Sequence, residues 1–196
     1  MNRTRKVFLT ECSDEDRKEA ENFIKDAFAS AYGANLQFFM PRLMTLRNNH
    51  NNLLAACGMR SAKDEKLYLE KYIDTPIEQI IRGKTGEDAT RNQIVEIGNL
   101  AVSASGIVRK TILAVINRLY EEGYDWVAFT GTKKLLNSFR SLGLDPVQIC
   151  MADPERLDIE SRMNWGSYFD NEPVVMIGNI QYGYVATQSG FHRPPG

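Results

Sequence analysis

The sequence has no excess of charge of either sign, and it has few residues suited to nucleophilic chemistry. Lysine and arginine number 24 against 25 aspartates and glutamates, so the formal net charge of the 196 residues is -1 at pH 7. Proteins whose main partner is a nucleic acid duplex or an anionic membrane normally carry a strong positive excess, so we expect no nucleic acid partner. The two histidines, His50 and His192, lie in an asparagine-rich turn and near the C-terminus. A Ser-His-Asp or Cys-His mechanism therefore has no suitable base.

Cysteine and long apolar runs are also scarce. Cys12, Cys57 and Cys150 are odd in number, widely spaced and form no CxxC motif, which predicts neither a disulfide framework nor a metal site. Buried thiols in a reducing compartment are the simpler interpretation. No stretch approaches the roughly 18 apolar residues of a membrane span, and VFLT after the basic MNRTRK is too short for a signal-peptide core. We expect a cytoplasmic protein without an integral membrane segment.

The length corresponds to about 1.3 domains of typical size. Hydrophobic residues make up 43% and charged residues 25%, which is ordinary globular usage and excludes disordered and collagen-like chains. We expect one domain over residues 1–196, with a core over about 5–183 and a C-terminal tail over 184–196.

The first half of the chain predicts mixed elements. A strand at 5–10 is followed by a helix from the N-cap Ser13 to about Gly33, with apolar residues spaced i, i+3, i+4, i+7. The apolar segment 35–47 contains Pro41 and predicts a short or broken helix. The runs 53–62 and 66–73, separated by KDE, predict a hairpin. A short helix is then expected from Thr75 to Gly83.

The second half predicts strand-helix-strand units around IVEIGNLAV at 94–102, whose nearly continuous hydrophobicity is typical of a central strand buried on both faces. The order of elements predicts an α/β (α+β) fold, with a mixed central sheet and helices on both faces. The remaining elements are expected as helices at 108–123, at 133–143 and from 153, and as strands at 125–131, 146–152 and 173–183.

Glu96 stands out because an ionised carboxylate inside a central strand is costly unless it is paired or faces a cleft. A buried ion-pair member and a functional carboxylate both remain open. Gly98 is typical of a bulge or of a close backbone approach. One bulged residue would bring Glu96 and Asn99 onto the same face, and it would splay this strand from its neighbour.

Other polar residues have a structural interpretation beside a functional one. Arg60 and Glu70 would face each other across the expected hairpin, where a salt bridge is favoured over catalysis. Tyr68, Glu70 and Tyr72 would share one face of a strand. An aromatic pair on such a face more often forms a half-buried surface than a ligand pocket. The small residues 103–106 and Arg109 at a helix start could bind an anion or simply cap the helix.

Several segments together resemble the acyl-CoA N-acyltransferase fold of GNAT enzymes and acyl-homoserine-lactone synthases, and more specifically the thermostable haemolysin family. The resemblance runs from about residue 67 to 180. The matching segments are LYLEKYIDTPIE, IVEIGNLAV, GYDWVAFTGT, LLNSFRSLGL, ADPERL and WGSYFDNEPVVMIGNI.

The resemblance implies a GNAT-like three-layer fold with a bulged, splayed central strand, and acyl transfer from an acyl-CoA or acyl-carrier-protein thioester to a small amine acceptor. Glu96, with Asn99, would be catalytic, Glu96 acting as general base. The donor side would comprise Leu100, Ala101 and Val102 at the pantetheine, Ser103, Ser105, Gly106 and Arg109 at the phosphates, and Thr130 and Phe139. The acceptor pocket would comprise Arg60, Glu70, Tyr72 and Trp165.

Two departures and two alternatives accompany this expectation. The phosphate segment reads SASGIV at 103–108 rather than the usual [RQ]-x-x-G-x-[GA], which keeps an acyl carrier protein as an alternative donor. Phe139 stands where many such enzymes have a tyrosine that protonates the leaving thiolate. The alternatives to catalysis are a membrane-active, haemolysin-like protein and a non-catalytic domain that binds an acyl group or coenzyme A.

Overall fold

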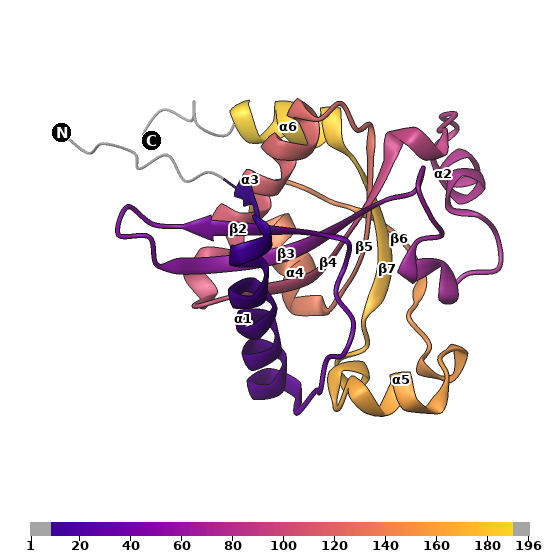
Figure 1. Cartoon of the computed structure of the whole chain (residues 1–196). Coiled ribbons are helices and arrows are strands. Elements are labelled where there is room, and N and C mark those ends of the chain that lie inside the picture. The colour runs from indigo at the N-terminus through magenta and orange to yellow at the C-terminus, as the bar shows by residue number, and fades with distance from the viewer. Residues whose placement is uncertain (1–8, 190–196) are drawn as a thin grey trace.

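The computed structural model describes residues 9–189. Their strands form one seven-stranded mixed sheet (Figure 1). β4 and β5 are parallel, and the other neighbouring pairs are antiparallel. In sheet order the strands are β1 (Leu9–Glu11), β2 (Arg42–Arg47), β3 (Leu53–Ser61), β4 (Ile94–Val102), β5 (Trp126–Gly131), β7 (Val174–Asn179) and β6 (Val147–Met151).

Helices cover both faces of this sheet, as the order of elements predicts. Val95 and Ile97 of β4 pack with buried residues of α3, α4 and α6, whereas Ile94 packs with residues of α2. α1 packs against β2, β3 and β4 on the face that α2 also covers. The helices are α1 (Asp14–Tyr32), α2 (Ile77–Thr85), α3 (Val108–Glu121), α4 (Lys133–Arg140), α5 (Ile159–Asn164) and α6 (Ile180–Ser189), with short 3-10 turns that include η1 (Tyr68–Lys71) and η3 (Ser105–Ile107).

α1 forms where its periodicity and capping residues predict it. The Ser13 hydroxyl accepts a hydrogen bond from the Asp16 amide, 3.2 Å away, which satisfies a free donor of the first turn. Gly33 ends the helix at φ 63°, the left-handed conformation that glycine adopts without strain. Ala20, Ile24 and Phe28 form its buried stripe.

The prediction of a broken helix over 35–47 is wrong, because residues 42–47 form β2. This strand pairs with β1 on one side and β3 on the other, so it is buried within the sheet. Pro41 lies immediately before the strand, where its missing N–H removes no hydrogen bond of the ladder.

The predicted hairpin of 53–62 with 66–73 is also wrong. β3 pairs with β2 and β4, and residues 68–71 form the turn η1. The amides of Tyr68 and Leu69, which a strand would offer to a neighbouring strand, donate instead to the Glu96 carboxylate. α2 likewise continues past the expected end at Gly83, and Gly86 ends it at φ 76°.

The last predicted strand, 173–183, ends at Asn179, and the expected tail from residue 184 begins inside α6. The Asn179 side chain accepts a hydrogen bond from the Tyr182 amide at 2.9 Å, which starts the helix. The Tyr184 ring stacks on Tyr120 of α3 with 3.8 Å between centroids, so this segment packs on the sheet's helical layer. The helix predicted from 153 is a 3-10 turn (Pro154–Arg156) followed by α5.

Part of the first predicted strand, residues 5–8, and His192 lie outside the described residues. Within residues 9–189, none of the helices combines the length and apolar character needed to cross a membrane.

Candidate active site

β4 and β5 separate in the middle of the sheet. Their parallel pairing covers Ile94–Ile97 of β4, whereas β5 continues alongside β7 as far as Gly131. The β3–β4 register shifts between Ala56 and Gly58, and Asn99 adopts φ 51°. The predicted bulge is therefore present, and the backbone of β4 beyond Ile97 has no β5 partner on that side.

Met40 fixes the bulge from outside the sheet. The Asn99 Oδ1 atom accepts a hydrogen bond from the Met40 amide at 3.1 Å. A Cβ atom on Gly58 would lie 2.6 Å from the Met40 Cβ, and one on Gly98 would lie 2.4 Å from the Met40 methyl carbon. Both glycines therefore permit a close approach of Met40. Arg60 is the register partner of Glu96, and Gly58 lies two residues before Arg60 in the same strand, so Gly58 faces the same side of the sheet as Glu96. The contact holds Asn99 on that side.

Glu96 is 3% exposed, and its carboxylate accepts hydrogen bonds from two amides of η1. The distances are 2.6 Å from the Tyr68 nitrogen and 3.0 Å from the Leu69 nitrogen. Burial raises the pKa of Glu96 to about 7, although these hydrogen bonds and the positive charge of Arg60 oppose the rise. A carboxyl that titrates near neutral pH is suited to accept a proton in catalysis.

A cavity of about 1130 Å³ runs from Glu96 through the gap between β4 and β5. Its wall beside Glu96 carries the polar side chains of Arg60, Tyr68 and Tyr72, and the indole of Trp165 donates to the Tyr68 hydroxyl at 3.1 Å. The wall formed by α3 and α4 is apolar, with Ile112, Val115, Ile116, Leu135 and Phe139 among its residues.

Most of the sequence-predicted site residues line this one cavity. Three predicted phosphate-side residues do not line it. They are Ser103, Gly106 and Arg109, which lie exposed around the start of α3. The Thr130 hydroxyl is buried without a hydrogen-bond partner at the point where β5 leaves β4. The predicted residues that line the cavity are Arg60, Tyr72, Glu96, Asn99, Leu100, Ala101, Val102, Ser105, Thr130, Phe139 and Trp165.

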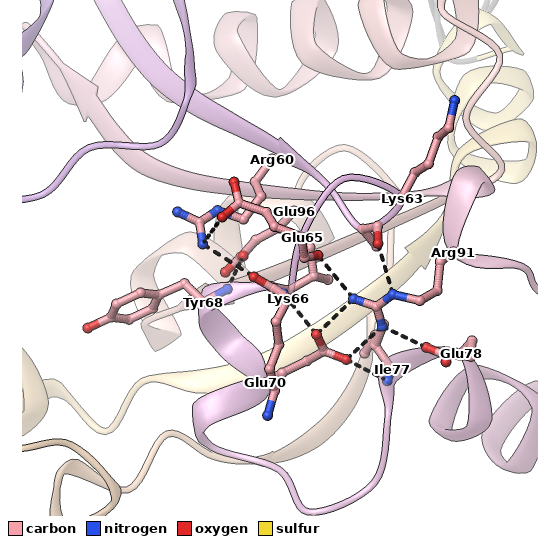
Figure 2. A network of polar contacts seen from close by, with 12 residues as sticks. Arg60, Lys63, Glu65, Lys66, Tyr68, Glu70, Ile77, Glu78, Arg91 and Glu96 are labelled. Carbon is pink, nitrogen blue, oxygen red and sulfur yellow. Dashed lines mark hydrogen bonds and ion pairs between the residues drawn. The ribbon is translucent and has the colours of Figure 1, made fainter.

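Glu70 does not line the cavity, and its expected pairing with Arg60 is wrong. Figure 2 shows the Glu70 carboxylate bound by the Arg91 guanidinium, with nitrogen–oxygen distances of 2.9 and 3.0 Å. Arg60 instead stands opposite Glu96 in the β3–β4 register and forms an ion pair with Glu65 at 3.4 Å. Glu70 does not face Arg60 because residues 68–71 form the turn η1 and do not pair with β3.

Burial alone would raise the pKa of Glu70. The hydrogen bonds from Arg91 and from the amides of Ile77 and Leu67 outweigh that effect, so the pKa lies below its ordinary value. Glu70 is thus a structural carboxylate that joins η1 to the start of α2.

Two residues carried no signal in the sequence: Met40 lies in a segment that was expected to be helical, and Arg91, which binds Glu70 outside the cavity, lies in a polar loop. The aromatic wall was predicted only in part, through Trp165. The ring centroid of Trp165 lies 5.9 Å from that of Phe28 and 4.9 Å from that of Tyr168. The aromatic residues of WGSYFD were the only signal of this wall in the sequence.

Comparisons with known proteins agree with this architecture. Residues 10–184 match the family described as "Thermostable hemolysin". No curated protein sequence matches the chain.

Similar solved structures cover nearly the whole chain at low sequence identity. The acyl-homoserine-lactone (AHL) synthase LasI is 10% identical with a TM-score of 0.61, covering 97% of this chain and 98% of its own. FeeM, an N-acyl amino acid synthase from uncultured soil microbes, is 14% identical with a TM-score of 0.58, covering 97% and 100%. The aminoglycoside acetyltransferase AAC(6')-Ib in complex with coenzyme A is 11% identical with a TM-score of 0.55, covering 93% and 99%. The fold is therefore that of GNAT-like acyltransferases.

Proposed function

Because the chain belongs to the thermostable hemolysin family and has a GNAT-like fold, we propose that it transfers an acyl group from a thioester to an amine. The observation that carries this proposal is the position of Glu96. Its carboxylate titrates near neutral pH, and it lies in the cavity that passes through the gap between β4 and β5.

The gap suits a pantetheine thioester. Leu100, Ala101 and Val102 line it on the part of β4 that has left β5, so their backbone can bind the amides of the pantetheine arm. Amides around the start of α3, near Ser105, would receive phosphate groups there. Both coenzyme A and an acyl carrier protein present this pantetheine arm, and both are included in the test below.

The apolar wall supports a donor with an acyl chain longer than acetyl. Ile112, Val115 and Ile116 of α3 and Phe139 of α4 line the part of the cavity away from the polar residues. A cavity of about 1130 Å³ exceeds what an acetyl group fills. Burial of each further methylene there contributes roughly 0.8 kcal/mol.

In the proposed reaction the acceptor nitrogen attacks the thioester carbonyl carbon. The new C–N bond forms, the C–S bond breaks, and Glu96 takes a proton from the nitrogen, directly or through water. The departing thiolate takes up a proton from Glu96 or from water, so one proton moves in total from the nitrogen to the released thiol. Backbone N–H groups of β4 that lie in the gap would stabilise the negative charge that develops on the carbonyl oxygen.

The test is release of free thiol from acetyl, octanoyl and palmitoyl thioesters, each attached to coenzyme A and to an acyl carrier protein, with and without amine acceptors. We expect acceptor-dependent release that is fastest with the longer chains. The control is the same panel without protein. Absence of release across the panel, together with dye leakage from liposomes, would instead support a membrane-active protein.

A further inference from the structure

Arg60 is the cation that stands nearest to Glu96 along the sheet. The two residues are Cα partners in the antiparallel β3–β4 pairing, so their side chains leave the sheet on the same face. Cβ atoms of such partners are about 4.5–5.5 Å apart. Both residues line the cavity, yet the Arg60 guanidinium pairs with Glu65 rather than with Glu96 (Figure 2).

The Nε donor of Arg60 is buried without a partner. Nη1 donates to the Lys66 carbonyl oxygen at 3.3 Å, but Nε is buried and has no hydrogen-bond partner. A buried donor on a charged group is costly when it stays unpaired, and native proteins rarely retain one. Arg60 lines the cavity, so an oxygen atom of a ligand there would satisfy Nε once the side chain turned from Glu65 toward the cavity.

The Glu96 carboxylate has the complementary capacity. Each of its oxygens accepts one amide hydrogen bond from η1, and a carboxylate oxygen has room for a second donor. The cavity lining carries charges of both signs, with Lys66 and Lys71 beside Arg60 and with Asp158 and Glu160 among the acidic residues. An acceptor with one negative and one positive group matches this lining better than a simple amine does.

We infer that the acceptor is an amino acid, whose carboxylate binds Arg60 and whose ammonium group faces Glu96. This inference rests on the proposed acyl transfer and names the class of its second substrate. A guanidinium suits the role because its planar set of N–H donors matches the geometry of a carboxylate. A simple amine has no group that matches the guanidinium, and a primary amide offers it one carbonyl oxygen without the negative charge.

The proton balance of the transfer fits this arrangement. The bound ammonium group loses one proton to the Glu96 carboxylate and becomes a nucleophilic amine. As the C–N bond forms and the C–S bond breaks, the nitrogen loses a second proton, which ends on the departing thiolate. The products are an N-acyl amino acid, whose carboxylate still faces Arg60, and a free thiol.

The test compares amino acids with their primary amides, which keep the amine and the side chain but lose the negative charge. We would measure kcat/KM for thiol release with each pair, in the unchanged protein and in Arg60→Gln. The amino acids should be preferred in the unchanged protein. Arg60→Gln should lower kcat/KM for the amino acids about tenfold more than for the amides. Both classes should lose some activity, because the loss of the Arg60 charge raises the pKa of Glu96 with either substrate.

Arg82→Gln is the matched control, since Arg82 is 73% exposed on α2 and pairs with Asp88 outside the cavity. It should behave as the unchanged protein does. Circular dichroism would establish that each variant is folded. If Arg60→Gln fails to fold, Arg60→Lys keeps the charge and should give a smaller loss that is again greater for the amino acids than for the amides. An equal loss with amino acids and amides, or no preference in the unchanged protein, overturns the inference.

Binding without a donor separates this inference from the proposed function. Trp165 lines the cavity, so its fluorescence can report the binding of each amino acid and each amide. Binding of amino acids that depends on Arg60, without any thiol release, supports the acceptor site and contradicts acyl transfer. Thiol release with amines that have no carboxylate, without Arg60-dependent binding, supports acyl transfer and overturns the amino acid assignment.

Discussion

Glu70 and Glu96 lie in two regions of the molecule, and their side chains are buried to nearly the same extent. They are 4% and 3% exposed, and each carboxylate accepts two backbone amide hydrogen bonds, Glu70 from Leu67 and Ile77 and Glu96 from the turn η1. Their pKa values nevertheless move in opposite directions, downward for Glu70 and upward to about 7 for Glu96.

The difference lies in the cation beside each carboxylate. Arg91 donates two hydrogen bonds to Glu70, which stabilises its charged form. Arg60 acts on Glu96 only through its charge, and its own ion pair is with Glu65. Burial therefore does not by itself distinguish a structural carboxylate from a reactive one. Two features distinguish the reactive carboxylate here: a cavity lies beside Glu96, and the nearby cation, Arg60, forms no ion pair with it.

The largest expected effect is on turnover. Glu96→Gln removes the proposed base while keeping the shape of the side chain, so we expect turnover to fall about a hundredfold or more. Glu70→Gln is the matched change in the other region and should leave turnover per folded molecule nearly unchanged. Thiol release, normalised to the folded fraction from circular dichroism, measures both.

Equal losses in Glu96→Gln and Glu70→Gln would show that both carboxylates act only through the structure. Unchanged turnover in Glu96→Gln would remove this residue from the mechanism.

The next effect is on the pH dependence of stability. The folded-state pKa of Glu96 lies above its ordinary value of 4.5, so the folded protein holds a proton that the unfolded chain has lost. Stability should therefore fall as pH rises from about 5 to 8, by roughly 3 kcal/mol from this group. Urea unfolding across that range measures the slope.

Glu96→Gln should flatten this slope. Glu70 has the opposite sign, because its folded-state pKa is lowered, so its contribution is lost as the pH falls below about 4.5. A Glu70→Gln variant that lost the slope between pH 5 and 8 would contradict the assignment of the two regions.

The sequence predicts the Glu96 region better than the Glu70 region, for a physical reason. A charged residue within an apolar run and a glycine two residues later are local signals, and they predicted the bulge at Asn99. The turn η1 carries the opposite local signal, since KLYLEKYI alternates as a strand does. Its amides bind Glu96, which lies 27 and 28 residues further along the chain. Local periodicity cannot report such a contact.

Two other features could not be predicted because they also depend on contacts between distant parts of the chain. The apolar segment around Pro41 suits a helix or a buried strand equally well by composition, and its pairing with β1 and β3 decides between them. Arg91 lies in a polar loop, and only the fold brings it to Glu70. The identity of the cation beside each glutamate therefore required the structure.

The smallest expected effect separates the two partners of Arg91. This guanidinium lies 2.9 Å from both Glu70 and Glu78, but their side chains are 4% and 26% exposed. Glu78→Gln leaves Glu70 paired and removes a charge that water already screens, so we expect a loss of about 0.5 kcal/mol in the free energy of unfolding. Glu70→Gln removes a buried charge and disturbs two amide hydrogen bonds, for which we expect a loss of about 2–3 kcal/mol. Urea unfolding at pH 7 compares them, and equal losses would mean that burial does not set the strength of these ion pairs.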